Sequence, residues 1–199
     1  MMIKDLGTGV VNAWEGLRPV TKKLVVGALN SGSAGLPSAK FSYDAHADWE
    51  LSRLLSALDE QTGKAADARR REIDELAETC VRLLEEQSGS AEVFIQLAER
   101  ALHQHDYDQF EKLSYKLFER FSPSEIAEVV RQAELPHIKA IGYETLVMLP
   151  VAALLPLLDD SLYAEIAIYA LEQKAYEFES EEARDLLDQL EYEASINQG

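Results

Sequence analysis

Apolar residues recur three and four positions apart along most of the chain, which is the spacing of one side of an α-helix. Stripes of this kind predict core positions at Ala47, Leu51, Leu54, Leu55 and Leu58, at Ile73, Leu76, Ala77, Cys80, Leu83 and Leu84, and at Ala183, Leu186, Leu187 and Leu190. The pattern predicts an all-α fold, either an irregular α-solenoid or a set of stacked helical hairpins, with a small N-terminal helical appendage.

The segment 147–173 is the most apolar part of the chain, and we expect the other helices to pack around it. In a helical projection, its second half has Leu162, Ile166, Tyr169, Ala170 and Gln173 on one side and Ala164, Ile168, Leu171 and Ala175 on the other. A helix with two apolar sides is expected between neighbours, so both sides are predicted to be buried. Pro156 predicts a kink or a break in the first half, because proline lacks the amide that a helix needs.

Local signals mark two helix starts. Ser122 and Glu125 have the spacing of a capping box, with Pro123 at the first helical position. Glu181 and Glu182 follow Ser180, and carboxylates are favoured in the first turn of a helix. Both signals predict helices that begin at these serines.

The first 37 residues are predicted to form an amphipathic N-terminal segment with a linker, and residues 44–199 the main, helical-repeat-like domain. The segment has apolar residues at helical spacing, which are Ile3, Leu6, Val10, Trp14 and Leu17 before Pro19 and Val20, Leu24, Val25 and Ala28 after it. The run 31–38, SGSAGLPS, predicts a flexible linker. Two interpretations remain open, because this segment could cover an end of the helical stack or lie on a membrane surface through residues 1–30.

Trp49 points away from the apolar stripe of its helix, at about 200° from Leu51 on the helical projection. A tryptophan in this position needs a contact of its own. It could receive the N-terminal segment of the chain, or it could be an anchor for a partner protein, where tryptophan is enriched. We favour contact with the N-terminal segment.

Two segments resemble known helical repeats. The run Leu154, Leu155, Pro156, Leu157, Leu158, Asp159 and Asp160, followed by Ala167, Ala170 and Leu171, is similar to one HEAT repeat. Residues 97–123, LAERALHQHDYDQFEKLSYKLFERFSP, resemble a tetratricopeptide repeat. Each resemblance implies a pair of antiparallel helices, and at the HEAT-like segment Ala164 and Glu165 stand where that family usually has Val-Arg.

The chain carries a formal net charge of −17, which is unevenly distributed. Residues 1–43 contain five basic and two acidic residues, so they carry +3 and the rest carries −20. A body with this charge repels nucleic acids and anionic membranes and attracts basic proteins. The charge also fits a simple role in solubility.

Residues with catalytic or metal-binding potential are few. His103, His105, Asp106 and Asp108 could supply ligands to one metal ion, but the spacing marks no second cluster to complete the site. Cys80 lies on an apolar stripe and is expected to be buried rather than reactive. As the one cysteine it forms no internal disulfide, which favours the cytoplasm. We expect no bound cofactor, no metal and no enzymatic activity.

The leading hypothesis is a non-enzymatic helical scaffold or adaptor that binds a basic protein partner, with an inhibitor or immunity-type protein as a sharper variant. Candidate partner-binding residues are Trp49, Tyr163, Glu165 and Glu172. One alternative is a peripheral membrane adaptor that uses residues 1–30. The other is a metal-dependent helical enzyme that uses the cluster at 103–108. The sequence leaves the partner and the oligomeric state undefined.

Overall fold

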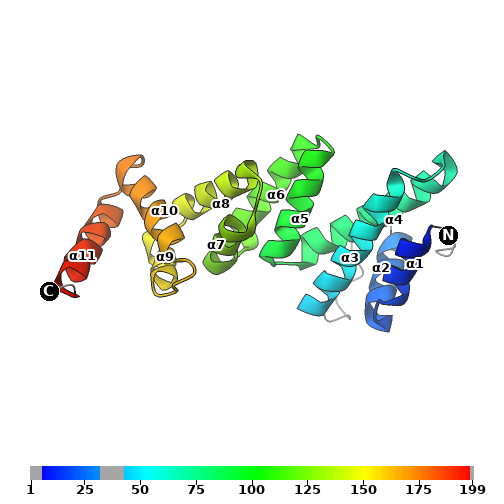
Figure 1. Cartoon of the computed structure of the whole chain (residues 1–199), viewed down its shortest axis with the longest axis horizontal. Coiled ribbons are helices and arrows are strands. Elements are labelled where there is room, and N and C mark those ends of the chain that lie inside the picture. The colour runs from blue at the N-terminus through cyan, green and yellow to red at the C-terminus, as the bar shows by residue number, and fades with distance from the viewer. Residues whose placement is uncertain (1–5, 32–42, 198–199) are drawn as a thin grey trace. The chain divides into compact units, whose positions relative to one another are not determined.

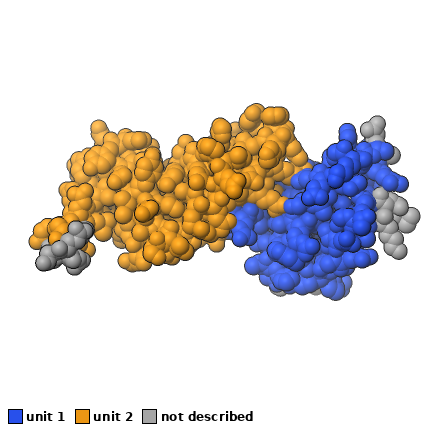
Figure 2. All heavy atoms as spheres, viewed as in Figure 1, with its two compact units in different colours: residues 1–93 blue, residues 94–199 orange. Residues whose placement is uncertain are grey.

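The computed structural model describes residues 6–31 and 43–197, and within them it has eleven α-helices and no strand (Figure 1). The helices are α1 Thr8–Glu15, α2 Pro19–Ser31, α3 Ala45–Thr62, α4 Asp67–Gln87, α5 Ala91–His103, α6 Tyr107–Arg120, α7 Pro123–Gln132, α8 Pro136–Met148, α9 Val151–Leu158, α10 Ala164–Tyr176 and α11 Glu181–Asn197. The all-α fold of stacked helical hairpins is therefore confirmed. The chain divides into two compact units, residues 1–93 and 94–199 (Figure 2).

In the first unit, α3 and α4 form a helical hairpin, α1 packs on α3, and α2 packs on both α3 and α4. The predicted stripes of α3 and α4 are buried, Cys80 included. The N-terminal helices bury Leu6, Val10, Leu17 and Val25 in the same unit. Their apolar sides are thus used within the protein. The predicted linker lies outside the described residues except for Ser31, and so does Ile3.

In the second unit, consecutive helices pair while alternate helices also touch. α7 packs on α8, α9 on α10 and α10 on α11. Further contacts join α6 to α8, α8 to α10, α7 to α9 and α7 to α10. Helices α6, α8 and α10 therefore form one layer and α7 and α9 another. The layers meet over buried residues such as Ile126, Val129, Ile138 and Leu146.

The prediction that α10 is buried on two sides is wrong. The buried residues of α10 form one stripe, Ile166, Ala167, Ala170, Leu171 and Ala175. Leu162, Ile168 and Tyr169 are 61%, 37% and 45% exposed. Leu162 precedes the first helical residue, Ala164, and small alanines on the buried stripe bring the neighbouring helices close. Apolar residues outside that stripe are left at the surface.

Three other local predictions have different outcomes. Pro156 does not break α9, which continues to Leu158; the chain instead turns by 116° between α8 and α9, at Leu149 and Pro150. The predicted start at Ser122 is confirmed, since its Oγ accepts a hydrogen bond from the Glu125 amide at 3.3 Å. The Ser180 hydroxyl accepts from the Ala183 amide at 3.3 Å, and α11 begins at Glu181 as predicted.

Candidate functional site

A groove runs between α6 and α8 in the second unit. Its volume is about 610 Å³. It is lined by Phe110, Glu111, Ser114, Tyr115, Phe118 and Glu119 of α6 and by Ile141, Glu144, Thr145 and Met148 of α8. The lining residues of α6 lie three and four positions apart, so they share one side of the helix. Most of the surface that they offer is apolar.

The walls of this groove are large side chains in contact with water. Tyr115 is 65% exposed, Met148 is 59% exposed and Phe118 is 44% exposed. The two hydroxyl groups between them are occupied, because Ser114 donates to the Phe110 carbonyl oxygen at 2.9 Å and Thr145 to the Ile141 carbonyl oxygen at 2.7 Å. The centre of the groove thus presents carbon and sulfur rather than free donors. Exposed apolar surface of this kind is typical of binding sites.

Carboxylates surround the apolar centre. Of the lining residues, Glu111, Glu119 and Glu144 are acidic and exposed, and none is basic. The second unit as a whole contains 21 acidic and 8 basic residues, a formal charge of −13 out of the −17 of the chain. The groove therefore combines an apolar floor with a negative rim, in the more acidic unit.

A second hollow of about 540 Å³ lies beside α8 on the side of α10, and Glu144 lines both. Its aromatic part is Tyr143 and Tyr169, whose rings meet edge to face with centroids 4.8 Å apart. Burial, with a smaller contribution from Tyr169, raises the pKa of the Tyr143 phenol. Glu134, Lys139 and Gln173 complete the polar part of the lining.

The candidate partner-binding residues of α10 fall into two groups. Glu165 and Glu172 are exposed on the same side as Ile168 and Tyr169, next to the second hollow. Tyr163 is half-buried, and its hydroxyl donates to Glu128 of α7 at 3.0 Å. Glu128 also accepts two hydrogen bonds from Arg131, at 2.6 and 2.5 Å. Tyr163 is therefore engaged in joining the start of α10 to α7.

Trp49 lies in the first unit and is 53% exposed, so at most part of the side chain is covered. Contact between Trp49 and the N-terminal segment stays a prediction. The Arg53 guanidinium carbon lies 4.6 Å from the Trp49 ring, and the His46 ring is 5.7 Å away. These contacts come from the same helix and leave much of the indole in water.

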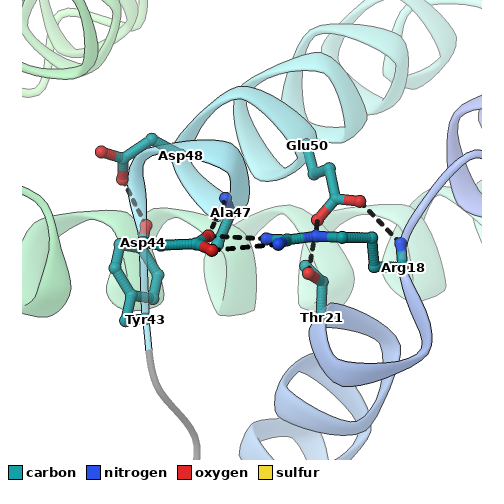
Figure 3. A network of polar contacts seen from close by, with 7 residues as sticks. All are labelled: Arg18, Thr21, Tyr43, Asp44, Ala47, Asp48 and Glu50. Carbon is teal, nitrogen blue, oxygen red and sulfur yellow. Dashed lines mark hydrogen bonds and ion pairs between the residues drawn. The ribbon is translucent and has the colours of Figure 1, made fainter.

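The N-terminal helices are held instead by the residue after Trp49. Glu50 is only 2% exposed and accepts hydrogen bonds from the Arg18 amide at 2.6 Å, from the Arg18 Nε at 3.1 Å and from the Thr21 hydroxyl (Figure 3). The same guanidinium donates to both oxygens of Asp44, at 3.0 and 2.6 Å. Glu50 of α3 thus caps the start of α2, where helix amides lack partners of their own.

The charges in this network are stabilised in their ionised forms. Burial alone would raise the pKa of Glu50, but the hydrogen bonds from Thr21 and Arg18 outweigh it, so the pKa is lowered. The ion pair with Arg18 and the Ala47 amide hold the pKa of Asp44 well below its usual range. A carboxylate with both oxygens occupied and a lowered pKa is a poor general base, which indicates a structural role for Glu50.

The possible metal ligands do not form a site. In the described part of the chain, no group of three or more His, Cys, Asp or Glu side chains is arranged to hold a metal ion. His103 ends α5, and His105 has a positive φ of 56° in the turn that follows. Asp106 caps α6 by accepting a hydrogen bond from the Gln109 amide at 3.0 Å. These residues shape the turn between the two helices.

Over residues 6–31 and 43–197, no single helix is both apolar enough and long enough to cross a membrane. Helices α8 and α9 meet those criteria only as a pair that is bent at its break. No protein-family model, curated protein or solved structure matches the chain.

The groove is not evident from the sequence, because Phe110, Leu113, Leu117 and Phe118 have the spacing of a single apolar side of one helix. In the structure the two leucines are buried and the phenylalanines are not. The signal was the width of the apolar arc, since Tyr115 and Phe118 extend it beyond what one neighbouring helix can cover.

Proposed function

We propose that this protein is a non-enzymatic helical scaffold that binds a basic protein through the second unit. The groove between α6 and α8 carries the proposal, because it joins exposed apolar side chains to a rim of carboxylates. Apolar and aromatic residues at the centre of an interface supply most of its affinity. Charges at the rim direct the approach of a partner of opposite sign.

The charge distribution supports a basic partner over a nucleic acid. Three-quarters of the net negative charge belongs to the second unit, which contains the groove. Nucleic acids are bound through phosphates and therefore need basic surfaces. Glu165 and Glu172, both exposed on α10, extend the acidic surface beyond the groove.

Affinity capture from a native lysate, followed by mass spectrometry, tests this function. We expect a basic protein to be captured at about 0.1 M salt and largely released at about 1 M, since screening shortens the reach of exposed charges from about 10 Å to about 3 Å. Capture that is limited to acidic proteins, or that is unchanged at the higher salt, contradicts the proposal.

Matched charge variants make the test specific. Glu111→Gln, Glu119→Gln and Glu144→Gln together remove three exposed charges from the groove, and capture of the basic protein should fall. Glu72→Gln, Asp74→Asn and Glu75→Gln remove the same number from the exposed side of α4, and capture should be retained. Equal loss in both variants would mean that total charge, rather than the groove, governs binding.

The resemblance to HEAT and tetratricopeptide repeats remains a proposal. The packing of α9 on α10 supports it, as does the succession of α5 and α6 along the chain. A cytoplasmic location and an inhibitor or immunity-type role remain predictions as well. The membrane alternative needs apolar residues that α1 and α2 bury against the rest of the first unit, such as Val10 and Val25.

A further inference from the structure

The groove between α6 and α8 has features that define its occupant more closely than a basic protein. This inference rests on the proposed function. Tyr115, Phe118 and Met148 stand in water along the groove, while Leu113 and Leu117 on the same helix are fully covered by the second unit. The core-facing side of α6 is therefore buried, while the apolar strip formed by Tyr115, Phe118 and Met148 stays exposed to solvent.

The shape of the strip fits a helix. Phe110, Ser114 and Phe118 are four residues apart on α6, and they span roughly 12 Å at about 1.5 Å per residue, a little over two helical turns. A third helix laid on two others places side chains three and four positions apart into such a groove. An extended peptide would need unpaired backbone groups to bond with, whereas the amides of α6 and α8 are bonded within their own helices.

The walls fit a protein segment better than a small molecule. A small ligand is usually enclosed, with most of its surface buried by the site. Here the two walls are formed by side chains that are themselves about half exposed or more, so a small ligand would remain largely in water. A helix covers a long, open groove and shields both walls along its length.

The rim defines the charge of that helix. Glu111 and Glu119 flank Tyr115 on α6, and Glu144 lies across the groove on α8. An occupant with lysine or arginine beside its apolar stripe places its cations next to these carboxylates. A second copy of this chain fits poorly, because two molecules of formal charge −17 repel each other.

We infer that the α6–α8 groove binds one amphipathic helix of a partner protein, with its apolar stripe between Phe118 and Met148 and its flanking lysines or arginines at Glu111, Glu119 and Glu144. Before binding, the partner segment is either unfolded or a helix whose apolar stripe is exposed to solvent. After binding, the groove covers that stripe. Its sequence carries apolar residues at i, i+3 or i+4, and i+7.

Three synthetic peptides of about 14 residues test this inference, a length at which an isolated helix is marginal in water. The first has leucines at helical spacing and lysines elsewhere, the second has the same composition in an order without periodicity, and the third has glutamates in place of the lysines. Fluorescence anisotropy with the full chain should show the first binding at least about tenfold more tightly than either control. Its circular dichroism should gain helical signal on binding.

Variants locate the binding. Phe118→Ser with Met148→Ser should weaken the first peptide by about tenfold or more, as loss of central apolar anchors does. Tyr176→Ser, at another exposed aromatic residue, should leave affinity unchanged. Glu111→Gln with Glu144→Gln should weaken binding and reduce its salt dependence, whereas Asp188→Asn with Glu191→Gln on α11 should do neither. All these positions are exposed, so we expect the variants to fold. Thermal unfolding of each variant checks this expectation.

Three results would overturn the inference: equal binding of the reordered peptide, no effect of either groove variant, or binding without a gain of helix. Displacement of the peptide by self-association of the chain, seen by sedimentation, would assign the groove to a second copy. If none of the three peptides binds but capture of the basic protein still falls in the Glu111→Gln, Glu119→Gln and Glu144→Gln variant, the inference fails and the proposed function stands.

Discussion

The side-chain nitrogen of Lys174 lies 2.6 Å from the carbonyl oxygen of Val147, to which it donates a hydrogen bond from α10 to the end of α8. The same nitrogen donates to the Leu149 carbonyl oxygen at 2.8 Å. The last carbonyls of a helix have no partners within it, and they favour a cation. Lys174 therefore closes α8 just before the chain turns into α9.

Replacement of this lysine should destabilise the second unit. Lys174→Met keeps the length of the side chain and removes the donor, so we expect a loss of about 1–2 kcal/mol in the free energy of unfolding. Urea unfolding measures it. Lys112→Met on the exposed side of α6 is the control and should change stability by less than about 0.5 kcal/mol. Equal effects would show that the contact with α8 contributes nothing.

Glu50 is the buried carboxylate that joins α2 to α3. Glu50→Gln replaces one accepting oxygen with an amide that faces the donors of Arg18 and Thr21, so we expect the free energy of unfolding to fall by about 2–3 kcal/mol. Glu60→Gln, an exposed change on the same helix, should be nearly neutral. Limited proteolysis should cut the first 31 residues of the Glu50→Gln variant faster, while a uniform change over the chain would argue against a local role.

Gly142 lies where α8 packs tightly against α7. A Cβ built there would lie 2.6 Å from the Val130 Cγ2, and valine has little freedom to move in a helix. Gly142→Ala should therefore cost about 1–3 kcal/mol, despite the better helix propensity of alanine. Gly9 on α1 has open space at the same position, so Gly9→Ala should be neutral or stabilise by up to about 1 kcal/mol. Thermal unfolding of the two variants checks this, because Gly142→Ala should lower the unfolding temperature whereas Gly9→Ala should leave it unchanged or raise it.

Glu128 should make the stability of the second unit depend on pH. The hydrogen bonds from Arg131, together with those from Gln132 and Tyr163, lower the pKa of Glu128 from 4.5 to about 2. Because the folded value is the lower one, the contribution is complete above pH 4.5 and is lost as the pH falls toward 2. Wild type should lose more stability across this window than Glu128→Gln. Parallel pH profiles of the two proteins would contradict the assignment.

The membrane hypothesis predicts that residues 1–30 bind lipid. Because Val10, Leu17 and Val25 are buried in the first unit, we expect the full chain to stay at the bottom of a flotation gradient with anionic vesicles. A protein that lacks the first 37 residues is the comparison. If the full chain floats and the truncated protein does not, α1 and α2 leave the first unit and enter the lipid.

The elements of the fold followed from local sequence, but the site did not. Asp44 and Ser122 cap α3 and α7 because a cap needs only a side chain and an amide three residues on. Glu50 stands between Trp49 and Leu51 and resembles a solvated acid, since its partner Arg18 is 32 residues away. Likewise, which apolar residues of α6 and α10 remain exposed depends on how closely their neighbours approach. Periodicity along one helix carries no information about that distance.

Glu144 belongs to the walls of both hollows beside α8. A cation held at one of them would neutralise a charge that the other also uses. Two cationic groups would thus be bound with negative cooperativity, and thermodynamic reciprocity requires each to weaken the other by the same factor. Where cations bind at both hollows, this one carboxylate would couple their occupancy.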